Sequence, residues 1–354
     1  MGPPDTAEQE IKRARVRALL EADGDAIALR DPANLAWYLG GARVHVVGGV
    51  SDPICEVAVT AGGDEVRTTV IEAPRLAAEE LGPGSPRLRA VPWWEPLGPA
   101  AGASDRPRRG ERDVAAELIA ARSALVPAEI ERFRALARET AAATGAALRA
   151  ARGDESEFAL AGRAARELLD RGIDPVVLLV AGEGRLRVHR HPLPTAAPLG
   201  SRAMLVACGR RHGLICSVTR MRAWTPLRPA ERTVYDGLLG VEAAALDATR
   251  PGARVGDVVR AIAGAYPAHG FPPDEWHQHH QGGPTGYAPR DYLASPADDG
   301  LVAEGQAFAW NPSGGGFKVE DTVLATADGV EVLSPDPEWP SVTVGGRERP
   351  DVLR

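Results

Sequence analysis

The chain has 354 residues, a formal net charge of −7 and 25% charged residues. A length above the usual size of one hydrophobic core predicts two domains. The acidic balance and the lack of a clustered basic face argue against a nucleic-acid partner, and no apolar run approaches the roughly 18 residues of a membrane span. The N-terminal residues lack a signal-peptide pattern, and three cysteines without metal-type spacing indicate a reducing, cytoplasmic location.

The first hundred residues alternate helical and strand patterns, as is typical of a small α/β domain. Apolar residues spaced among charges predict a helix over residues 8–22, which Gly24 ends. A second, short helix is predicted over residues 34–39, because two glycines follow it. The predicted strands are residues 25–29, 44–47, 55–60 and 68–71.

A segment rich in Pro, Gly, Ala and Arg, residues 96–112, predicts the domain boundary, with domains of residues 1–112 and 113–354. The second domain opens with helical patterns and closes with strands. The predicted helices are residues 127–152, 155–171, 231–248 and 255–266, and the predicted strands are residues 176–180, 204–207, 307–310, 318–325 and 331–333. Helices lying over an antiparallel sheet give an α+β fold.

Two segments of the sequence resemble the pita-bread family, which includes methionine aminopeptidase, aminopeptidase P, prolidase, creatinase and ectoine hydrolase. The stretch PANLAWYLGG at 32–41 is similar to the opening of the N-terminal domain in the aminopeptidase P and creatinase branch. The stretch VEDTVL at 319–324, followed by DGVEVL at 328–333, is the strongest match. The resemblance covers nearly the whole chain. It implies a creatinase-like α/β domain, a pita-bread domain with a curved antiparallel sheet covered by helices, and a homodimer.

The metallopeptidases of that family hold two metal ions with two Asp, one His and two Glu. Matching those positions to this chain gives Ala207, Ser217 (or Val218), His280, Asn311 and Glu320. Three carboxylates are thus replaced, and two divalent cations would keep a large uncompensated charge in a desolvated site. We therefore expect no metal cofactor. The alternative is one weakly bound divalent ion, Mn or Zn, held by His280, Asn311 and Glu320.

Metal-free members of the family, creatinase and ectoine hydrolase, indicate another chemistry. Creatinase has its catalytic His in a His-x-Pro-x-Thr segment, and HPLPT at 191–195 has the same His-to-Thr spacing with its prolines elsewhere. Imidazole suits acid/base catalysis because its pKa lies near neutrality. The resemblance implies that His191 is the acid/base group, and that His280 and Glu320 orient water or substrate. The alternative is that His191 and His280 have structural roles, and that an arginine such as Arg220 pairs with the buried carboxylate of Glu320.

Residues around the same segment are candidate substrate contacts. Active aminopeptidases of this branch have a second His seven residues after the ligand His, where this chain has Tyr287, a poor base that can still donate a hydrogen bond. Trp276 and Trp310 are candidate walls for a cationic or planar substrate, with core packing as the alternative. Asn311 and Arg220 complete the predicted set.

Three functional hypotheses follow for a small-molecule substrate. The leading one is a metal-independent hydrolase that acts on a C–N bond of a small amino-acid-like or amidine-like compound. The second is a divergent metal-dependent Xaa-Pro aminopeptidase or dipeptidase. The third is a catalytically inactive binding protein, or an enzyme recruited to a non-hydrolytic biosynthetic step.

Overall fold

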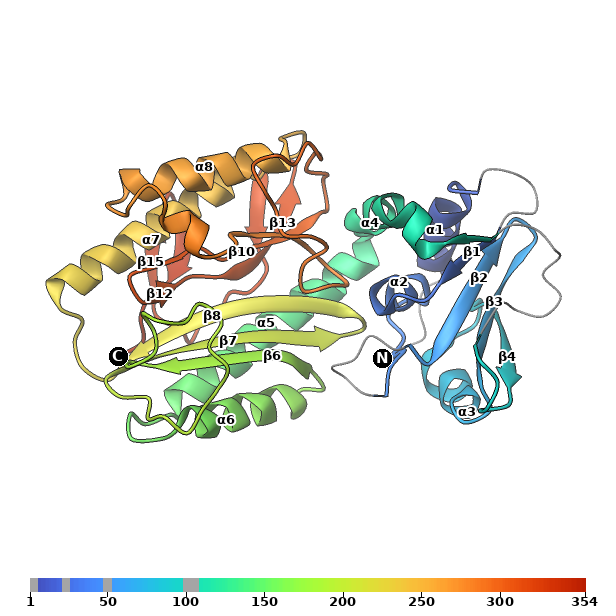
Figure 1. Cartoon of the computed structure of the whole chain (residues 1–354), viewed down its shortest axis with the longest axis horizontal. Coiled ribbons are helices and arrows are strands. Elements are labelled where there is room, and N and C mark those ends of the chain that lie inside the picture. Colours follow the sequence, from blue (N-terminus) through green and yellow to red (C-terminus); the bar gives the residue numbers. More distant parts are fainter. Residues whose placement is uncertain (1–5, 21–25, 47–52, 98–107) are drawn as a thin grey trace. The chain divides into compact units, whose positions relative to one another are not determined.

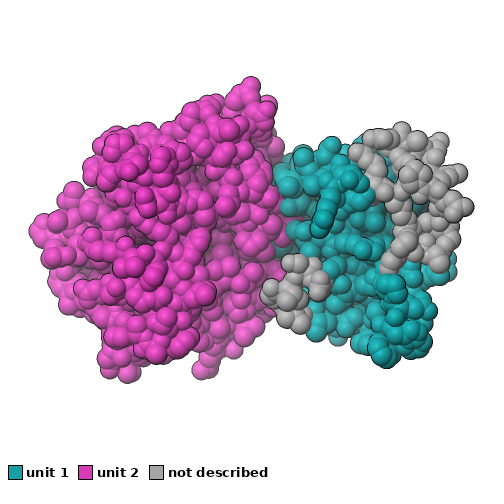
Figure 2. All heavy atoms as spheres, viewed as in Figure 1, with its two compact units in different colours: residues 1–129, 212–214 teal, residues 130–211, 215–354 magenta. Residues whose placement is uncertain are grey.

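The computed structural model describes residues 6–20, 26–46, 53–97 and 108–354, which form two compact units (Figure 1, Figure 2). The first unit extends to Glu129 and includes residues 212–214, and the second contains the remainder. The division therefore falls at the start of helix α5 (Pro127–Arg149), whereas composition placed the boundary at residue 112. Residues 113–129 group with the first unit because helix α4 (Ala115–Ser123) packs against α1 (Thr6–Arg17) and α2 (Pro32–Tyr38).

A five-stranded sheet lies at the centre of the first unit, in the order β4-β3-β2-β1-β5. Its strands are β1 (Ala26–Leu29), β2 (Cys55–Thr60), β3 (Gly63–Thr69), β4 (Arg87–Val91) and β5 (Arg108–Gly110). The central pairs β1–β2 and β2–β3 are antiparallel, whereas both edge strands run parallel to their neighbours. Of the predicted strand 44–47, residues 44–46 form no strand and Val47 lies outside the described residues.

The first sheet of the second unit has the order β6-β7-β8, with β6 (Asp174–Gly182), β7 (Arg202–Arg211) and β8 (Leu214–Ala223). Alternate residues of β6 and β7, such as Val180 and Leu205, pack against α5 and α6 (Glu157–Leu169). The other alternate set, such as Val206, packs into a core shared with α7 (Pro229–Ala248) and α8 (Val255–Ala268). This sheet is therefore buried on both faces (Figure 1).

A second sheet of this unit has the order β14-β13-β10-β9. Its strands are β9 (Gly282–Thr285), β10 (Ala307–Trp310), β13 (Asp321–Thr326) and β14 (Gly329–Val332). Two short hairpins form separate two-stranded sheets: β11 (Ser313–Gly314) with β12 (Phe317–Lys318), and β15 (Ser341–Val344) with β16 (Arg347–Pro350). An isolated bridge between Thr219 and Glu320 joins β8 to the chain just before β13. The expected α+β fold is confirmed.

The glycine-rich segment at Gly282 and Gly283 forms a strand that the sequence patterns did not predict. Gly282 has φ 108°, and a Cβ there would collide with the Ala309 carbonyl oxygen of β10. Glycine is needed because only it combines this backbone conformation with so close a neighbour. The strand fixes the residues just before it, His279 and His280, beside β10. Among the described residues, no helix is long and apolar enough to cross a membrane.

Candidate active site

Glu320 lies between β12 and β13 with 2% of its surface exposed, and both its carboxylate oxygens have partners. Arg290 Nη2 donates to Oε1 at 2.6 Å, and Thr219 Oγ1 donates to Oε2 at 2.8 Å. Lys318 Nζ lies 3.7 Å from Oε2. Burial alone would raise the pKa of Glu320, but Lys318 and Arg290 outweigh it and lower that pKa to about 2. The carboxylate is therefore ionised and already paired.

Lys318 is the second unusual charge, because its side chain is buried among the same residues. Burial lowers the pKa of Lys318, and Glu320 partly opposes that effect. Two cationic side chains, Lys318 and Arg290, thus face one carboxylate. The interior of this site therefore has a surplus of positive charge.

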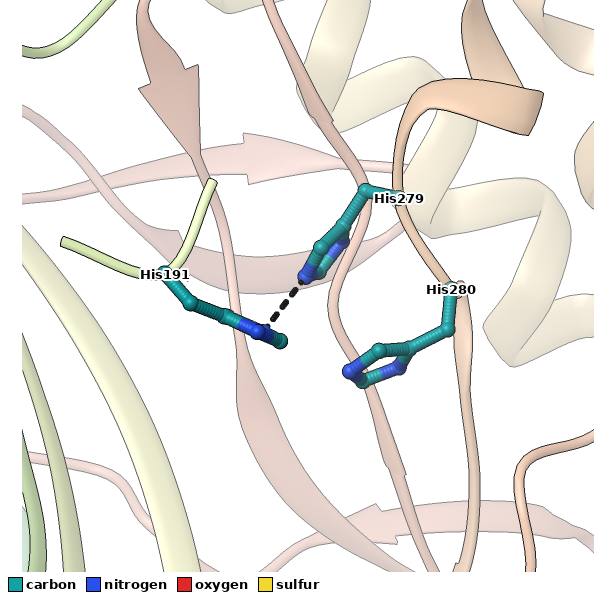
Figure 3. Close-up of side chains that lie close together, drawn as sticks. All are labelled: His191, His279 and His280. Carbon is teal, nitrogen blue, oxygen red and sulfur yellow. Dashed lines mark hydrogen bonds between the residues drawn. The ribbon is translucent and has the colours of Figure 1, made fainter. Parts of the chain in front are cut away.

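Three histidines converge beside this charged group (Figure 3). His191 is exposed on the loop between β6 and β7, buried His279 follows the short helix η3 (Glu275–Gln278), and His280 precedes β9. His191 Nε2 and His279 Nε2 form a hydrogen bond of 3.0 Å. One ring nitrogen of each of the three histidines lies within 4.8 Å of the others.

The three imidazoles have lowered pKa values. Burial is the largest cause for each, and the positive charge of Lys318 also acts on all of them. The pKa of His280 falls to about 4. The rings are therefore neutral near pH 7, which is the form that accepts a proton.

The loop that carries His191 is fixed at both ends by buried or half-buried acidic groups. Before it, Arg190 donates to Glu275 at 2.6 Å and to Ser313 at 3.2 Å. After it, the backbone N–H and the hydroxyl of Thr195 both donate to Glu157, at 2.9 Å and 2.7 Å. These contacts hold His191 beside the segments that carry His279 and His280.

The three positions where the family has carboxylates hold neutral residues here, and they do not all face Glu320. Ala207 lies on the face of β7 opposite to Cys208, and it is Cys208 that contacts the site, with its Sγ 3.2 Å from Ser217 Oγ. Ser217 Oγ also accepts from Arg290 at 3.2 Å. Asn311 is buried, and its Oδ1 has no hydrogen-bond partner among the described residues.

These residues do not fit a pair of divalent metal ions. Such a pair is bridged and neutralised by several carboxylates, whereas here Glu320 is the acidic group and its oxygens are taken by Arg290 and Thr219. A cation at this position would also meet Lys318 and Arg290, and repulsion between like charges in a buried site costs several kcal/mol in order of magnitude. The same pairing weakens the alternative of one ion held by His280, Asn311 and Glu320.

The predicted substrate contacts fall into two groups. Trp310 packs in the core against Phe308, and its ring N–H donates to Thr249 at 2.9 Å. Arg220 donates to Asp321 at 2.8 Å and to the Ser334 carbonyl, so it does not partner the Glu320 carboxylate. The structure thus gives both residues structural contacts, because β10 and β8 turn these side chains toward the packed interior.

The other two aromatic residues lie nearer the histidines in the chain. Trp276 belongs to η3 and is half-buried, and its carbonyl accepts a hydrogen bond from Gln281, the residue after His280. Tyr287 follows β9 and is 4% exposed. Both remain predictions as substrate contacts.

Five residues of the site were not predicted as functional: Cys208, Thr219, His279, Arg290 and Lys318. Lys318 lies two residues before Glu320, so alternation along the chain was an available signal for it. His279 directly precedes His280, so alternation would have placed it on the other face. Arg290 lies in a loop, and no spacing rule connects it to Glu320. Its pairing depends on the tertiary fold.

Comparison with known proteins identifies the family and a relative of this chain. Residues 131–327, more than half of the chain, match the family described as "Metallopeptidase family M24". The Bacillus subtilis (strain 168) protein named "Putative dipeptidase YkvY" is 26% identical over 181 residues, which cover 49% of this chain and 49% of that protein. The match therefore spans about half the length of this curated relative.

Solved structures show the same fold over nearly the whole chain. The prolidase from Pyrococcus horikoshii OT3 superposes with a TM-score of 0.74 at 15% identity, covering 93% of this chain and 98% of that one. The dipeptidase PepE from Mycobacterium ulcerans superposes with a TM-score of 0.72 at 19% identity, covering 95% and 98%. At such identities the likeness establishes the pita-bread fold, in agreement with the resemblance seen in the sequence.

Proposed function

The chain belongs to metallopeptidase family M24, and on this premise we propose that it is a hydrolase that works without the family's metal pair. Its substrate would be a small amino-acid-like or amidine-like compound with a C–N bond. The observation that supports this proposal is the pairing of Glu320 with Arg290 and Thr219, beside Lys318 and three neutral histidines. Protein side chains occupy the electrostatic role that metal ions have in a two-metal hydrolase.

In this mechanism His191 is the general base, because its ring is neutral, exposed and held by His279. Its free nitrogen takes a proton from water as the water oxygen bonds to the substrate carbon. The resulting imidazolium returns the proton to the leaving nitrogen as the C–N bond breaks. One water is consumed, and the histidine ends in its starting state.

The positive surplus at Lys318 and Arg290 would stabilise the negative charge that develops on the attacked carbon's oxygen or nitrogen substituent. Glu320 holds these two cations in place and limits their repulsion. The orphan Oδ1 of Asn311 would accept a hydrogen bond from a substrate N–H group. His280 would orient the water or the substrate.

The test is turnover of a panel of small amides, ureas and amidines by protein treated with a chelator. His191→Ala should lower kcat by about 10²–10⁴-fold, the usual range for a general acid/base. Glu320→Gln should also lower kcat, because Lys318 and Arg290 would lose the carboxylate that holds them in place. His189→Ala is the matched control, since His189 is exposed on the same loop and outside the cluster. Unchanged turnover in His191→Ala, or two transition-metal ions per chain in active protein, would contradict the proposal.

A metal-dependent Xaa-Pro dipeptidase is the second candidate, because the names of the relatives include prolidase and dipeptidase. It differs in one measurable way. Release of a residue ahead of proline should then rise with added Mn²⁺ or Co²⁺ and disappear with a chelator. The charge balance around Glu320 favours the metal-independent reaction over this one.

A further inference from the structure

We propose that His191, His279 and His280 form a site for one exchangeable transition-metal ion, with Zn²⁺ as the best-suited ion. The site uses no carboxylate, and His280 is the one position that it shares with the five ligand positions compared above. The ion would bind beside the charged group at Glu320 and would not replace it. The second part of the inference is that an ion bound at this site would inhibit the acid/base reaction. This part rests on the proposed function.

The first argument is geometric. Two nitrogen ligands at 2.0–2.1 Å from a tetrahedral zinc ion lie about 3.3 Å apart, and His191 Nε2 lies 3.0 Å from His279 Nε2. The largest separation among the ligand atoms is 4.8 Å, so closure around an ion needs a shift of about 1.5 Å. Figure 3 shows the three rings directed toward a common space. His191 lies on an exposed loop, where such a shift is least costly.

The second argument is chemical. Neutral imidazole is a preferred ligand of zinc and copper, whereas hard ions such as Mg²⁺ prefer oxygen ligands. Three histidines and one water make a four-coordinate zinc site. The Nδ1 atoms of His279 and His280 are buried without hydrogen-bond partners among the described residues, so no acceptor fixes a proton on them. An ion would replace the hydrogen bond between His279 and His191.

The charge around the cluster sets the strength of binding. Lys318 and Arg290 repel a cation, and Glu320 offsets one of them. Supporting acceptors that orient zinc-bound histidines are also missing at the buried Nδ1 atoms. We therefore expect an ion that binds more weakly than structural zinc and exchanges with chelators. Exposure of His191 gives the ion a path to the site.

Inhibition follows because a neutral imidazole has one basic nitrogen. An ion on His191 Nε2 leaves the proton on Nδ1, the nitrogen that is not bonded to His279 and that acts as the base in the proposed mechanism. A zinc-bound His191 cannot accept a proton from water in the mechanism proposed above. Added Zn²⁺ should therefore lower turnover, and a chelator should restore it.

The experiment is calorimetric titration of chelator-treated, dialysed full-length protein with ZnCl₂, with Co²⁺ absorption as a second readout of tetrahedral nitrogen ligands. We expect one ion per chain. His191→Ala should weaken binding at least tenfold, and the double variant His191→Ala/His279→Gln should abolish it. His189→Ala and His277→Ala, which change exposed neighbouring histidines, should keep wild-type binding. Thermal unfolding of each variant checks that it is folded, and His191→Ala changes an exposed residue and tests the site without disturbing the core.

Three outcomes would overturn the metal site: no saturable binding, one ion that the double variant retains, or two ions per chain. Zinc binding without any loss of turnover would overturn the inhibitory part. The binding measurement needs no substrate, so it distinguishes the two proposals. Zinc binding in a protein without hydrolase activity refutes only the proposed function, and metal-free turnover without zinc binding refutes only the metal site.

Discussion

At the scale of single residues, the charge state of Glu320 makes a prediction about pH. An unfolded Glu titrates near 4.3, whereas in the fold Lys318 and Arg290 outweigh burial and lower the pKa of Glu320 to about 2. A lowered folded-state pKa means that this carboxylate stabilises the protein above about pH 4.3, and that the contribution is lost as the pH falls through about 2. The advantage of wild type over Glu320→Gln in free energy of unfolding should therefore shrink by about 2–3 kcal/mol from about pH 5 to about pH 2.

Urea unfolding of both proteins across this pH range measures the difference directly. In a Lys318→Met background the pH-dependent difference should be smaller, because one of the two cations that lower the pKa is gone. A difference that does not change with pH would show that Glu320 is not held ionised by its neighbours.

The sequence could locate some of these residues but not their pairing. His191, His280 and Glu320 were predicted from the family resemblance, and in the structure they lie near one another. In the alternative, structural interpretation Arg220 would pair with Glu320, yet Arg290 is the arginine that pairs with its carboxylate. Spacing along a strand predicts which face a residue occupies, but not which loop residue reaches that face from elsewhere in the chain.

At the scale of secondary-structure elements, β9 requires glycine at position 282. Gly282→Ala should lower the free energy of unfolding by roughly 2–4 kcal/mol, because alanine is strained at φ 108° and its Cβ would collide with β10. Gly264→Ala is the control, since Gly264 is exposed in α8 with no atom near its added Cβ. It should be neutral or stabilising by about 0.5–1 kcal/mol. Thermal unfolding measures the stability of both variants. Equal changes in stability would contradict the idea that the close contact between Gly282 and β10 requires glycine.

The same elements show where periodicity succeeds and fails. Long helices such as α7 and α8 were predicted nearly to their ends, because an apolar stripe over several turns is a strong signal. The predicted strand 318–325 is instead divided between β12 and β13, with Glu320 between them. Lys318 pairs with Ser313, whereas Asp321 pairs with Trp310, so the chain changes its partner strand at this point. Such a change leaves no mark in the alternation of apolar residues.

At the scale of the whole molecule, the residues assigned to the site all lie in the second compact unit. Its histidines and charged residues alone come from four separate segments, at His191, His279–His280, Arg290 and Lys318–Glu320. A site assembled in this way depends on the sheets that fix each segment, more than on any local motif. The predicted homodimer stays a prediction, which sedimentation equilibrium of the full chain tests.

The last prediction concerns the buried ion network that joins four elements of this unit. Arg349 of β16 donates to both oxygens of Glu242 on α7, at 2.8 and 2.5 Å, and to Asp321 of β13 at 2.6 Å. Asp321 also pairs with Arg220 of β8 and directly follows Glu320. Arg349→Met would leave two buried carboxylates short of a partner, at a cost of about 3–5 kcal/mol. Because Asp321 positions the neighbouring Glu320, the same change should lower turnover as well as stability.

Arg347→Met is the matched control, two residues away on the same strand. Arg347 pairs with Asp247 at 2.7 Å with both side chains partly exposed, and such a pair contributes at most about 1 kcal/mol. The loss in free energy of unfolding, measured with heat and with urea, should therefore be several-fold larger for Arg349→Met than for Arg347→Met. Equal losses would mean that burial of the network does not matter. A destabilised Arg349→Met protein with full turnover below its unfolding temperature would mean that Glu320 keeps its position without this support.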